Sequence, residues 1–194
     1  MALFRWAAPI YDISMKMVGH GNSLQELVNR IDPQSGQRLL DLGGGTGQLL
    51  DYLPHNMKVT LVDSSKEMLA QARKKETGQK VKYVNARGDD MPLDNDSFDY
   101  IVVADALHHF EQVEGTLEEV KRVLKPEGEV YILEFDPASL LTKIITVGES
   151  IAGEPVNFYK PEELDALFAQ TGFTSRPEKI SNSLYIIKAE IAGD

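Results

Sequence analysis

The sequence contains no cysteine. This absence excludes disulfide bridges, metal sites built on thiolates and a cysteine nucleophile. The 194 residues must therefore be held together by a hydrophobic core, and an apolar fraction of 42% is ordinary for a folded globular protein. Because a small chain without disulfides suits a reducing compartment, we expect the protein in the cytoplasm.

Basic residues are scarce, since 20 Lys and Arg stand against 30 Asp and Glu and give a formal net charge of −10. Nucleic-acid binding and polybasic membrane anchoring both depend on Lys and Arg, so the charge argues against both. Long apolar runs are missing as well, and the apolar N-terminus is interrupted by Arg5, Pro9 and Asp12, unlike a signal peptide. No repeat or linker divides the chain, so we expect a single domain over residues 1–194.

Strand patterns alternate with helix patterns along the chain. The expected strands are Arg38–Leu42, Lys58–Val62, Val81–Val84, Asp99–Ala104, Glu129–Phe135 and a closing pair, Phe173–Ile180 and Leu184–Ile191. A capping box at Ser23 predicts a helix through Ile31, and a second capping box at Ser64 predicts a helix that stops near Gly78. An apolar face over Thr116–Leu124 predicts a third helix, which Pro126 ends. A fourth helix is expected from Pro161 to Gly172.

This order predicts a doubly wound α/β fold with a mostly parallel sheet. Ligands of such sheets bind outside the carboxyl ends of the strands, so the residues that follow each strand are the candidate site residues.

Four glycines occupy five positions after the first strand, at Gly43, Gly44, Gly45 and Gly47. Glycine tolerates positive φ and allows a ligand to approach the backbone closely, whereas an inconsequential turn would not need so many. A dinucleotide site requires the spacing G-x-G-x-x-G, but its third glycine position is Gln48 here. Asp41, just before the loop, would repel a pyrophosphate and attract a cationic amino group.

Asp63 ends the second strand, 20 residues after Gly43. A carboxylate at this place can accept hydrogen bonds from both hydroxyls of a ribose. The alternative is that Asp63 only precedes the helix start at Ser64.

Four segments in this order, LDLGGGTG, LVDSSKEML, MPLDNDSFDYIVVADALHHF and EEVKRVLKPEGEVYILEF, resemble the class I S-adenosylmethionine-dependent methyltransferases, specifically their type 11 group. That group includes the ubiquinone/menaquinone C-methyltransferases. The resemblance covers Arg38 to Phe135 and extends more loosely through Pro161–Phe173. It implies a Rossmann-like methyltransferase fold with a seven-stranded sheet, one closing antiparallel strand and helices on both faces.

The resemblance also implies that S-adenosylmethionine is the cofactor. Asp41 and the backbone of Gly43–Gly45 would hold its methionine part, with Gly47 as a further cofactor-binding candidate and Ala104 nearby at the end of the fourth strand. Asp63 would hold the ribose hydroxyls, and Ser64 and Met68 would lie near the adenine.

Adenine recognition departs from the family pattern. The usual acidic position falls on Arg87, which cannot accept a hydrogen bond, and the usual backbone N–H falls on Gly88. Either Asp89 or Asp90 substitutes, or the loop is shifted by a residue or two. Glu127 also stands where the family often has glycine, in a turn far from the cofactor.

Two adjacent histidines, His108 and His109, follow the fourth strand near the expected position of the methyl group. Both can be structural, and this reading is the stronger one for His108. His109 is the candidate general base if the acceptor arrives protonated, because an imidazole titrates near neutral pH. No ligand spacing indicates a metal site.

Acceptor selection should come from two segments outside the shared core, the N-terminal segment (residues 1–22, with Trp6 and Tyr11) and the insertion Pro137–Lys160 (with Phe158 and Tyr159). Their aromatic residues either cover a flat or apolar acceptor or simply cap the sheet. We expect a small-molecule acceptor, with quinone- and lipid-like compounds favoured, in a monomer or homodimer. Two alternatives stay open: a non-catalytic S-adenosylmethionine-binding or partner-activating protein, and a nicotinamide-dependent oxidoreductase.

Overall fold

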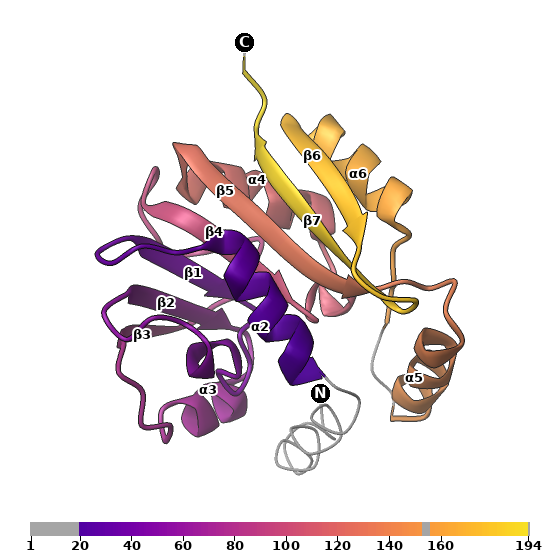
Figure 1. Ribbon diagram of the computed structural model, residues 1–194, viewed down its shortest axis with the longest axis horizontal. Coiled ribbons are helices and arrows are strands. Elements are labelled where there is room, and N and C mark those ends of the chain that lie inside the picture. The colour runs from indigo at the N-terminus through magenta and orange to yellow at the C-terminus, as the bar shows by residue number, and fades with distance from the viewer. Residues whose placement is uncertain (1–19, 153–155, 194) are drawn as a thin grey trace.

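One seven-stranded sheet forms the centre of the protein (Figure 1). The computed structural model describes residues 20–152 and 156–193. The strand order is β3-β2-β1-β4-β5-β7-β6, and only β7 runs antiparallel to its neighbours, β5 and β6. The strands are β1 (Arg38–Leu42), β2 (Lys58–Asp63), β3 (Lys80–Asn85), β4 (Phe98–Ala104), β5 (Leu124–Phe135), β6 (Phe173–Lys179) and β7 (Leu184–Ile191). The predicted doubly wound sheet with a closing antiparallel strand is confirmed.

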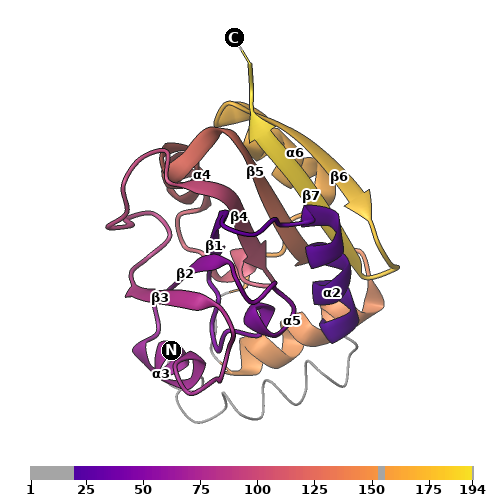
Figure 2. The same cartoon turned by 60° about the vertical axis from the view of Figure 1, so that its left-hand side comes forward.

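Helices cover both faces of this sheet, as expected. They are α2 (His20–Ile31), α3 (Lys66–Ala72), α4 (Val113–Val123), α5 (Leu140–Ala152) and α6 (Pro161–Gln170), with two short 3-10 helices, η1 (Leu49–Asp51) and η2 (Leu107–His109). In Figure 1, α2 crosses the front of the sheet and α4 lies behind it; Figure 2 shows the same arrangement from the side of β3. The sheet therefore separates two hydrophobic cores, one formed with α2 and α3 and the other with α4 and α6.

Strand alternation decides which polar residues reach which face. In β1, Leu39 packs with α2 and α3 while Leu40 packs with α4, so Asp41 faces the same side as Leu39. By the same alternation Leu61, and with it Asp63, face α2 and α3. The two candidate acidic residues therefore share one face at the carboxyl ends of neighbouring strands.

Three predicted helix boundaries are wrong. Helix α2 begins at His20, before the expected cap Ser23. Helix α3 is capped by Ser65 rather than Ser64, because the Asp63 carboxylate accepts the Ser65 N–H (2.8 Å) and leaves the Ser65 hydroxyl to accept from the N–H of Met68 (3.2 Å). This helix ends at Ala72, well before Gly78, where a Cβ would lie 2.5 Å from the His55 ring; Gly78 thus allows close packing and is not a helix cap.

The boundary between α4 and β5 also differs from the prediction. Helix α4 begins at Val113 because the buried face of Leu117 and Val120 continues one turn earlier at Val113. It ends at Val123, and β5 starts directly at Leu124, which pairs with Phe98 of β4. Pro126 therefore lies inside a strand instead of ending the helix.

Helix α5, within the insertion Pro137–Lys160, was not predicted. Its Leu140, Ile144 and Val147 side chains are exposed, whereas Thr142 is buried. This reverses the usual amphipathic pattern, so no core-facing stripe indicates the helix. Among the helices of the described ranges, none is long and apolar enough to cross a membrane.

Candidate cofactor site

The loop after β1 depends on glycine at each of its first three positions. Gly43 and Gly45 have φ of 73° and 52°, in the left-handed region. A Cβ at Gly43 would lie 2.6 Å from the Cβ of Ala106, and one at Gly44 would lie 2.5 Å from Oδ2 of Asp41. At Gly45, by contrast, the nearest atom to an added Cβ is the Gly43 carbonyl oxygen, at 4.0 Å. The protein therefore packs closely against the loop at Gly43 and Gly44, whereas the space beside Gly45 is open.

Asp41 lies beneath this loop with only 2% of its surface exposed. Its Oδ2 atom has no hydrogen-bond partner among residues 20–152 and 156–193. Burial, with a smaller contribution from the charge of Asp63, raises the pKa of the Asp41 carboxyl to about 7. A buried carboxylate with an unused acceptor fits a ligand that brings a cationic N–H donor.

Asp63 connects the loops that follow β1 and β2. Its Oδ2 accepts the Gly45 N–H at 2.9 Å, and its Oδ1 accepts the Ser65 N–H at 2.8 Å. Burial raises the pKa of this carboxyl, and the two backbone donors oppose the rise. Since each carboxylate oxygen has two lone pairs, Asp63 can hold the loops and still accept from two hydroxyls. The structural and the binding interpretation of Asp63 are thus compatible.

A cavity opens on the α2 and α3 side of this loop. Six predicted residues line it, namely Asp41, Gly43, Gly44, Gly45, Met68 and Ala104. The structure adds five residues that were not among the candidate cofactor residues, namely Leu24, Thr46, Gln48, Leu49 and Asp105. Thr46 and Gln48 belong to the glycine-rich loop and Asp105 directly follows a strand, so strand-end reasoning could have found them. Leu24 comes from α2, and only the tertiary fold reveals its place.

The other predicted cofactor residues do not line this cavity. Gly47 (φ 75°) shapes the turn, and a Cβ there would lie 3.0 Å from Leu50. Ser64 is exposed. Gly88 and the loop both lie beside the Phe110 ring, which is 3.5 Å from a Cβ built at Gly88 and 3.2 Å from one at Gly43.

Asp89 is bound to Arg87. The Arg87 guanidinium contacts both carboxylate oxygens, at 2.8 and 3.1 Å, and also reaches Glu111 at 2.7 Å. Hydrogen bonding to Arg87 holds the pKa of Asp89 below its usual range. Asp89 is therefore an ionised acceptor fixed in place by the very residue that departs from the family pattern.

His108 forms a buried pair with Glu134. Its Nδ1 lies 2.9 Å from both Glu134 carboxylate oxygens, and its backbone N–H donates to Oε2 at 3.1 Å. The Phe135 N–H donates to Oε1 at 3.1 Å, so the Glu134 carboxylate is well satisfied. This hydrogen-bonded, buried position supports the structural interpretation of His108.

The cluster around His108 contains groups that ligate metals. Asp105, His108 and Glu134, all buried, place one ligand atom each within 4.8 Å of one another. Sequence spacing could not reveal this cluster, because Glu134 comes from a different strand. Since Glu134 already accepts hydrogen bonds from the ring and backbone of His108, we interpret the cluster as a hydrogen-bonded support for the site.

His109 lies in η2 beside this support. Its ring centroid is 4.1 Å from that of His108, and the Phe158 ring packs 4.3 Å from His108. His109 does not line the cofactor cavity. The insertion residue Phe158 thus packs against η2, the segment that follows β4.

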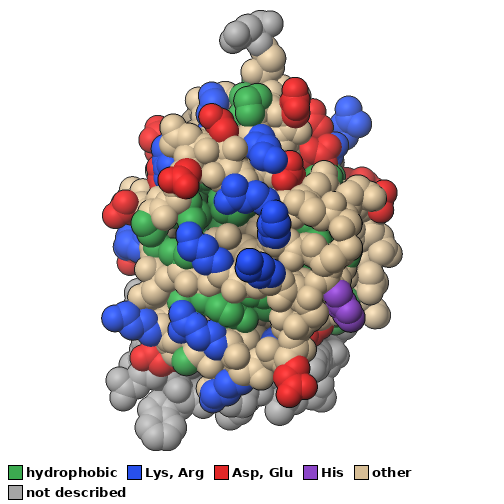
Figure 3. Space-filling model, turned by 90° about the vertical axis from the view of Figure 1, so that its left-hand side faces the viewer, with side chains coloured by type: hydrophobic (Ala, Val, Ile, Leu, Met, Phe, Trp, Pro, Cys, Tyr) green, Lys and Arg blue, Asp and Glu red, His purple; other side chains and the backbone are tan. Residues whose placement is uncertain are grey.

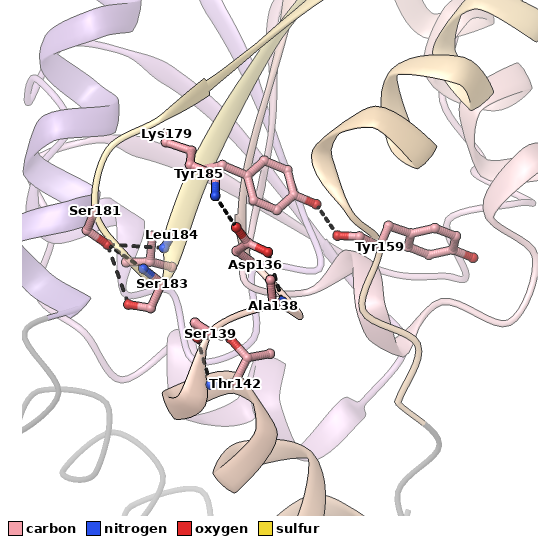
Figure 4. Close-up of polar contacts among 10 residues, drawn as sticks. All are labelled: Asp136, Ala138, Ser139, Thr142, Tyr159, Lys179, Ser181, Ser183, Leu184 and Tyr185. Carbon is pink, nitrogen blue, oxygen red and sulfur yellow. Dashed lines mark hydrogen bonds and ion pairs between the residues drawn. The ribbon is translucent and has the colours of Figure 1, made fainter.

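Both ends of the insertion are held by the last strands of the sheet (Figure 4). Asp136 accepts from the Ala138 N–H at 2.9 Å and pairs with Lys179 of β6 at 2.7 Å. Further along, the Tyr185 hydroxyl of β7 donates to the Tyr159 carbonyl at 2.8 Å. Trp6 and Tyr11 of the N-terminal segment, which was expected to cover the acceptor together with the insertion, lie outside the described residues.

Comparison with known proteins gives consistent matches. Residues 40–132 match the model of a methyltransferase domain family. A demethylmenaquinone methyltransferase from Clavibacter sepedonicus is 33% identical over 139 residues, which cover 69% of this chain and 57% of that protein. A demethylmenaquinone methyltransferase from Thermus thermophilus is 29% identical over 208 residues, which cover 92% of this chain and 94% of that protein. The chain thus spans little more than half of the first relative and nearly all of the second.

A solved structure shares the fold over almost the whole chain. It belongs to the complex between the Haloferax volcanii Trm112 methyltransferase activator and a methyltransferase, with a TM-score of 0.84, 19% identity and 98% coverage of both chains.

Proposed function

Because the chain belongs to the type 11 group of the class I S-adenosylmethionine-dependent methyltransferases, we propose that it transfers the methyl group of this cofactor to a small, quinone-like acceptor. The single observation that carries the proposal is the Asp41 carboxylate, buried beneath the glycine loop with an unused acceptor atom. A site for a pyrophosphate-containing cofactor would not place a carboxylate there, because the two charges repel.

Different residues of the chain would contact different parts of the cofactor. Asp41 would pair with the amino group of the methionine part, and Asp63 would accept from the ribose hydroxyls. The open space above Gly45 lets a ligand approach the loop, and Met68 offers an apolar surface for the adenine. When bound, S-adenosylmethionine supplies an activated methyl group on a sulfonium ion.

The acceptor side is formed by η2 and the insertion. The relatives from Clavibacter sepedonicus and Thermus thermophilus are both named demethylmenaquinone methyltransferases, which favours a flat quinone-like ring. Phe158, held against His108, offers an aromatic face for such a ring. Fixing the acceptor here and excluding water lowers the barrier to transfer mainly through orientation.

His109 is our candidate for the general base. Methylation of a ring carbon displaces a proton, which a neutral imidazole can accept. Glu134 holds His108, and the His108 ring in turn packs against His109, so the position of His109 is supported from the core.

The proposal is tested by supplying the protein with S-adenosylmethionine and a panel of acceptors: demethylated naphthoquinols, benzoquinols, phenols and amines. S-adenosylhomocysteine release and product mass are the readouts. We expect methylation of quinol ring carbons, and weaker cofactor binding with lower turnover in Asp41→Asn. Turnover with amines alone would contradict the acceptor class. Cofactor binding without turnover on any acceptor would instead favour the non-catalytic alternative.

A further inference from the structure

Three basic residues stand side by side at the amino ends of three neighbouring strands. Arg38 of β1 is in register with Lys58 of β2, which is in register with Lys80 of β3. Residues in register in a parallel sheet point to the same face, and neighbouring strands lie about 4.8 Å apart. Lys82, two residues beyond Lys80, extends the row along β3 on that face. All four residues are exposed.

This row is unfavourable for the protein alone. Like charges directly opposite each other on neighbouring strands destabilise a sheet. The chain carries 30 acidic residues, yet no ion pair joins Lys58, Lys80 or Lys82 to an acidic side chain of the described ranges. Lysines on an edge strand often serve to prevent aggregation, but Arg38 and Lys58 lie on inner strands, where edge protection is not needed.

The surface around the row is open. β3 is the last strand of the sheet, so its outer edge presents unpaired backbone groups. The connection from β3 to β4, residues 86–97, contains no helix that would cover this part of the sheet. Figure 3 shows Lys and Arg side chains gathered at the centre of this side of the molecule, with apolar side chains between them. Across the β3 edge, on the α3 side of the sheet, Arg73 stacks on Tyr83, and Arg73 and Lys74 are both exposed.

We propose that the β3 edge binds an acidic, extended segment of a partner protein, which adds a strand to the sheet. Strand addition uses the backbone groups of the open edge, and alternate side chains then supply specificity. Acidic residues at every second position of the added segment would lie opposite Lys80 and Lys82, and the row through Lys58 to Arg38 extends the positive field beneath them. A nucleic acid could use these charges but not the backbone edge. The basic row begins at the amino ends of the strands, whereas the cofactor cavity lies at their carboxyl ends and no β3 residue lines it, so a strand added to β3 leaves that cavity accessible.

The test uses the full chain and a labelled synthetic peptide that alternates glutamate with threonine. Fluorescence anisotropy gives its affinity, and hydrogen exchange reports on the β3 amides. We expect binding that weakens with salt, new protection of the β3 amides, and a loss of at least about tenfold in Lys80→Glu/Lys82→Glu. The matched control is Lys143→Glu/Lys160→Glu, which makes the same charge change at exposed residues away from β3 and should stay within about twofold of the unmodified protein.

Three results would overturn the proposal: no binding at low salt, equal weakening in both double variants, or binding without protection of β3. If a single-stranded RNA of similar length binds more tightly than the peptide, the surface is assigned to nucleic acid instead. Every one of these outcomes is independent of the methyl-transfer assay.

Discussion

The carboxylate of Asp63, at the end of β2, accepts a 2.9 Å hydrogen bond from the backbone N–H of Gly45, in the loop that follows β1. Two residues that the sequence places 18 positions apart therefore form one unit, and the glycine loop takes its shape partly from the ribose-binding candidate. A change at Asp63 thus acts on stability and on binding together.

We expect Asp63→Ala to weaken cofactor binding by about 1.5–3 kcal/mol, because hydrogen bonds to a charged acceptor are lost. The variant should also melt at a lower temperature, since it leaves the Gly45 and Ser65 N–H groups without their acceptor. Calorimetry and thermal denaturation measure the two effects. Asp51→Ala, which removes an exposed carboxylate paired with Lys75, is the matched control. Unchanged affinity in a folded Asp63 variant would leave this residue with a purely structural role.

Asp41→Asn should separate binding from stability. Removing the charge weakens S-adenosylmethionine binding by about 1.5–3 kcal/mol, because the pairing with the amino group is lost. The same change should raise the melting temperature of the cofactor-free protein at pH 8, because an ionised carboxylate is no longer buried there. A variant that binds normally would remove the main support for the proposed function.

The pH dependence follows from the direction of the Asp41 shift. Its carboxyl has a pKa of about 7 in the fold against 3.8 for an unperturbed Asp, so the folded state keeps this proton where the unfolded state has lost it. This contribution to stability is therefore present at low pH and is lost as pH rises from about 4 to about 7, at up to about 1.4 kcal/mol per pH unit. Binding of a cationic amino group should show the opposite trend, strengthening up to about pH 7 and then levelling off. Denaturation and calorimetry across this range provide the measurement, and Asp41→Asn should flatten both profiles.

Two glycine substitutions should have different consequences. Gly43→Ala brings a Cβ to 2.6 Å from Ala106, so we expect a strongly destabilised protein. Gly45→Val meets open space on the cavity side and should abolish cofactor binding with a smaller loss of stability, arising from its φ of 52°. Thermal denaturation and cofactor titration of the two variants distinguish these effects. Retained binding in folded Gly45→Val would place the ligand elsewhere.

The sequence was most informative where a buried strand ends at a chemically distinctive loop. The bounds of β1 and β7 agree with the prediction, because the buried apolar residues of each strand leave little choice of register. The cavity residues Asp41 and Gly43 to Gly45 could be predicted because only glycine tolerates that loop geometry. Leu24 and the Glu134 partner of His108 could not, since their positions depend on how distant elements pack. Helix α5 was not predicted for a different reason, because its apolar residues, such as Ile144, are exposed to solvent.

The position of β7 between β5 and β6 affects the order in which the protein can assemble on the ribosome. In the sheet β6 pairs only with β7, so it must wait until that later strand has been synthesised. The cavity-lining residues all lie between Leu24 and Asp105, so they leave the exit tunnel early. The hydroxyl that anchors Tyr159 arrives only with Tyr185. A nascent chain can therefore gather every cavity-lining residue before Tyr185 anchors the Tyr159 segment, which we propose to lie beside the acceptor.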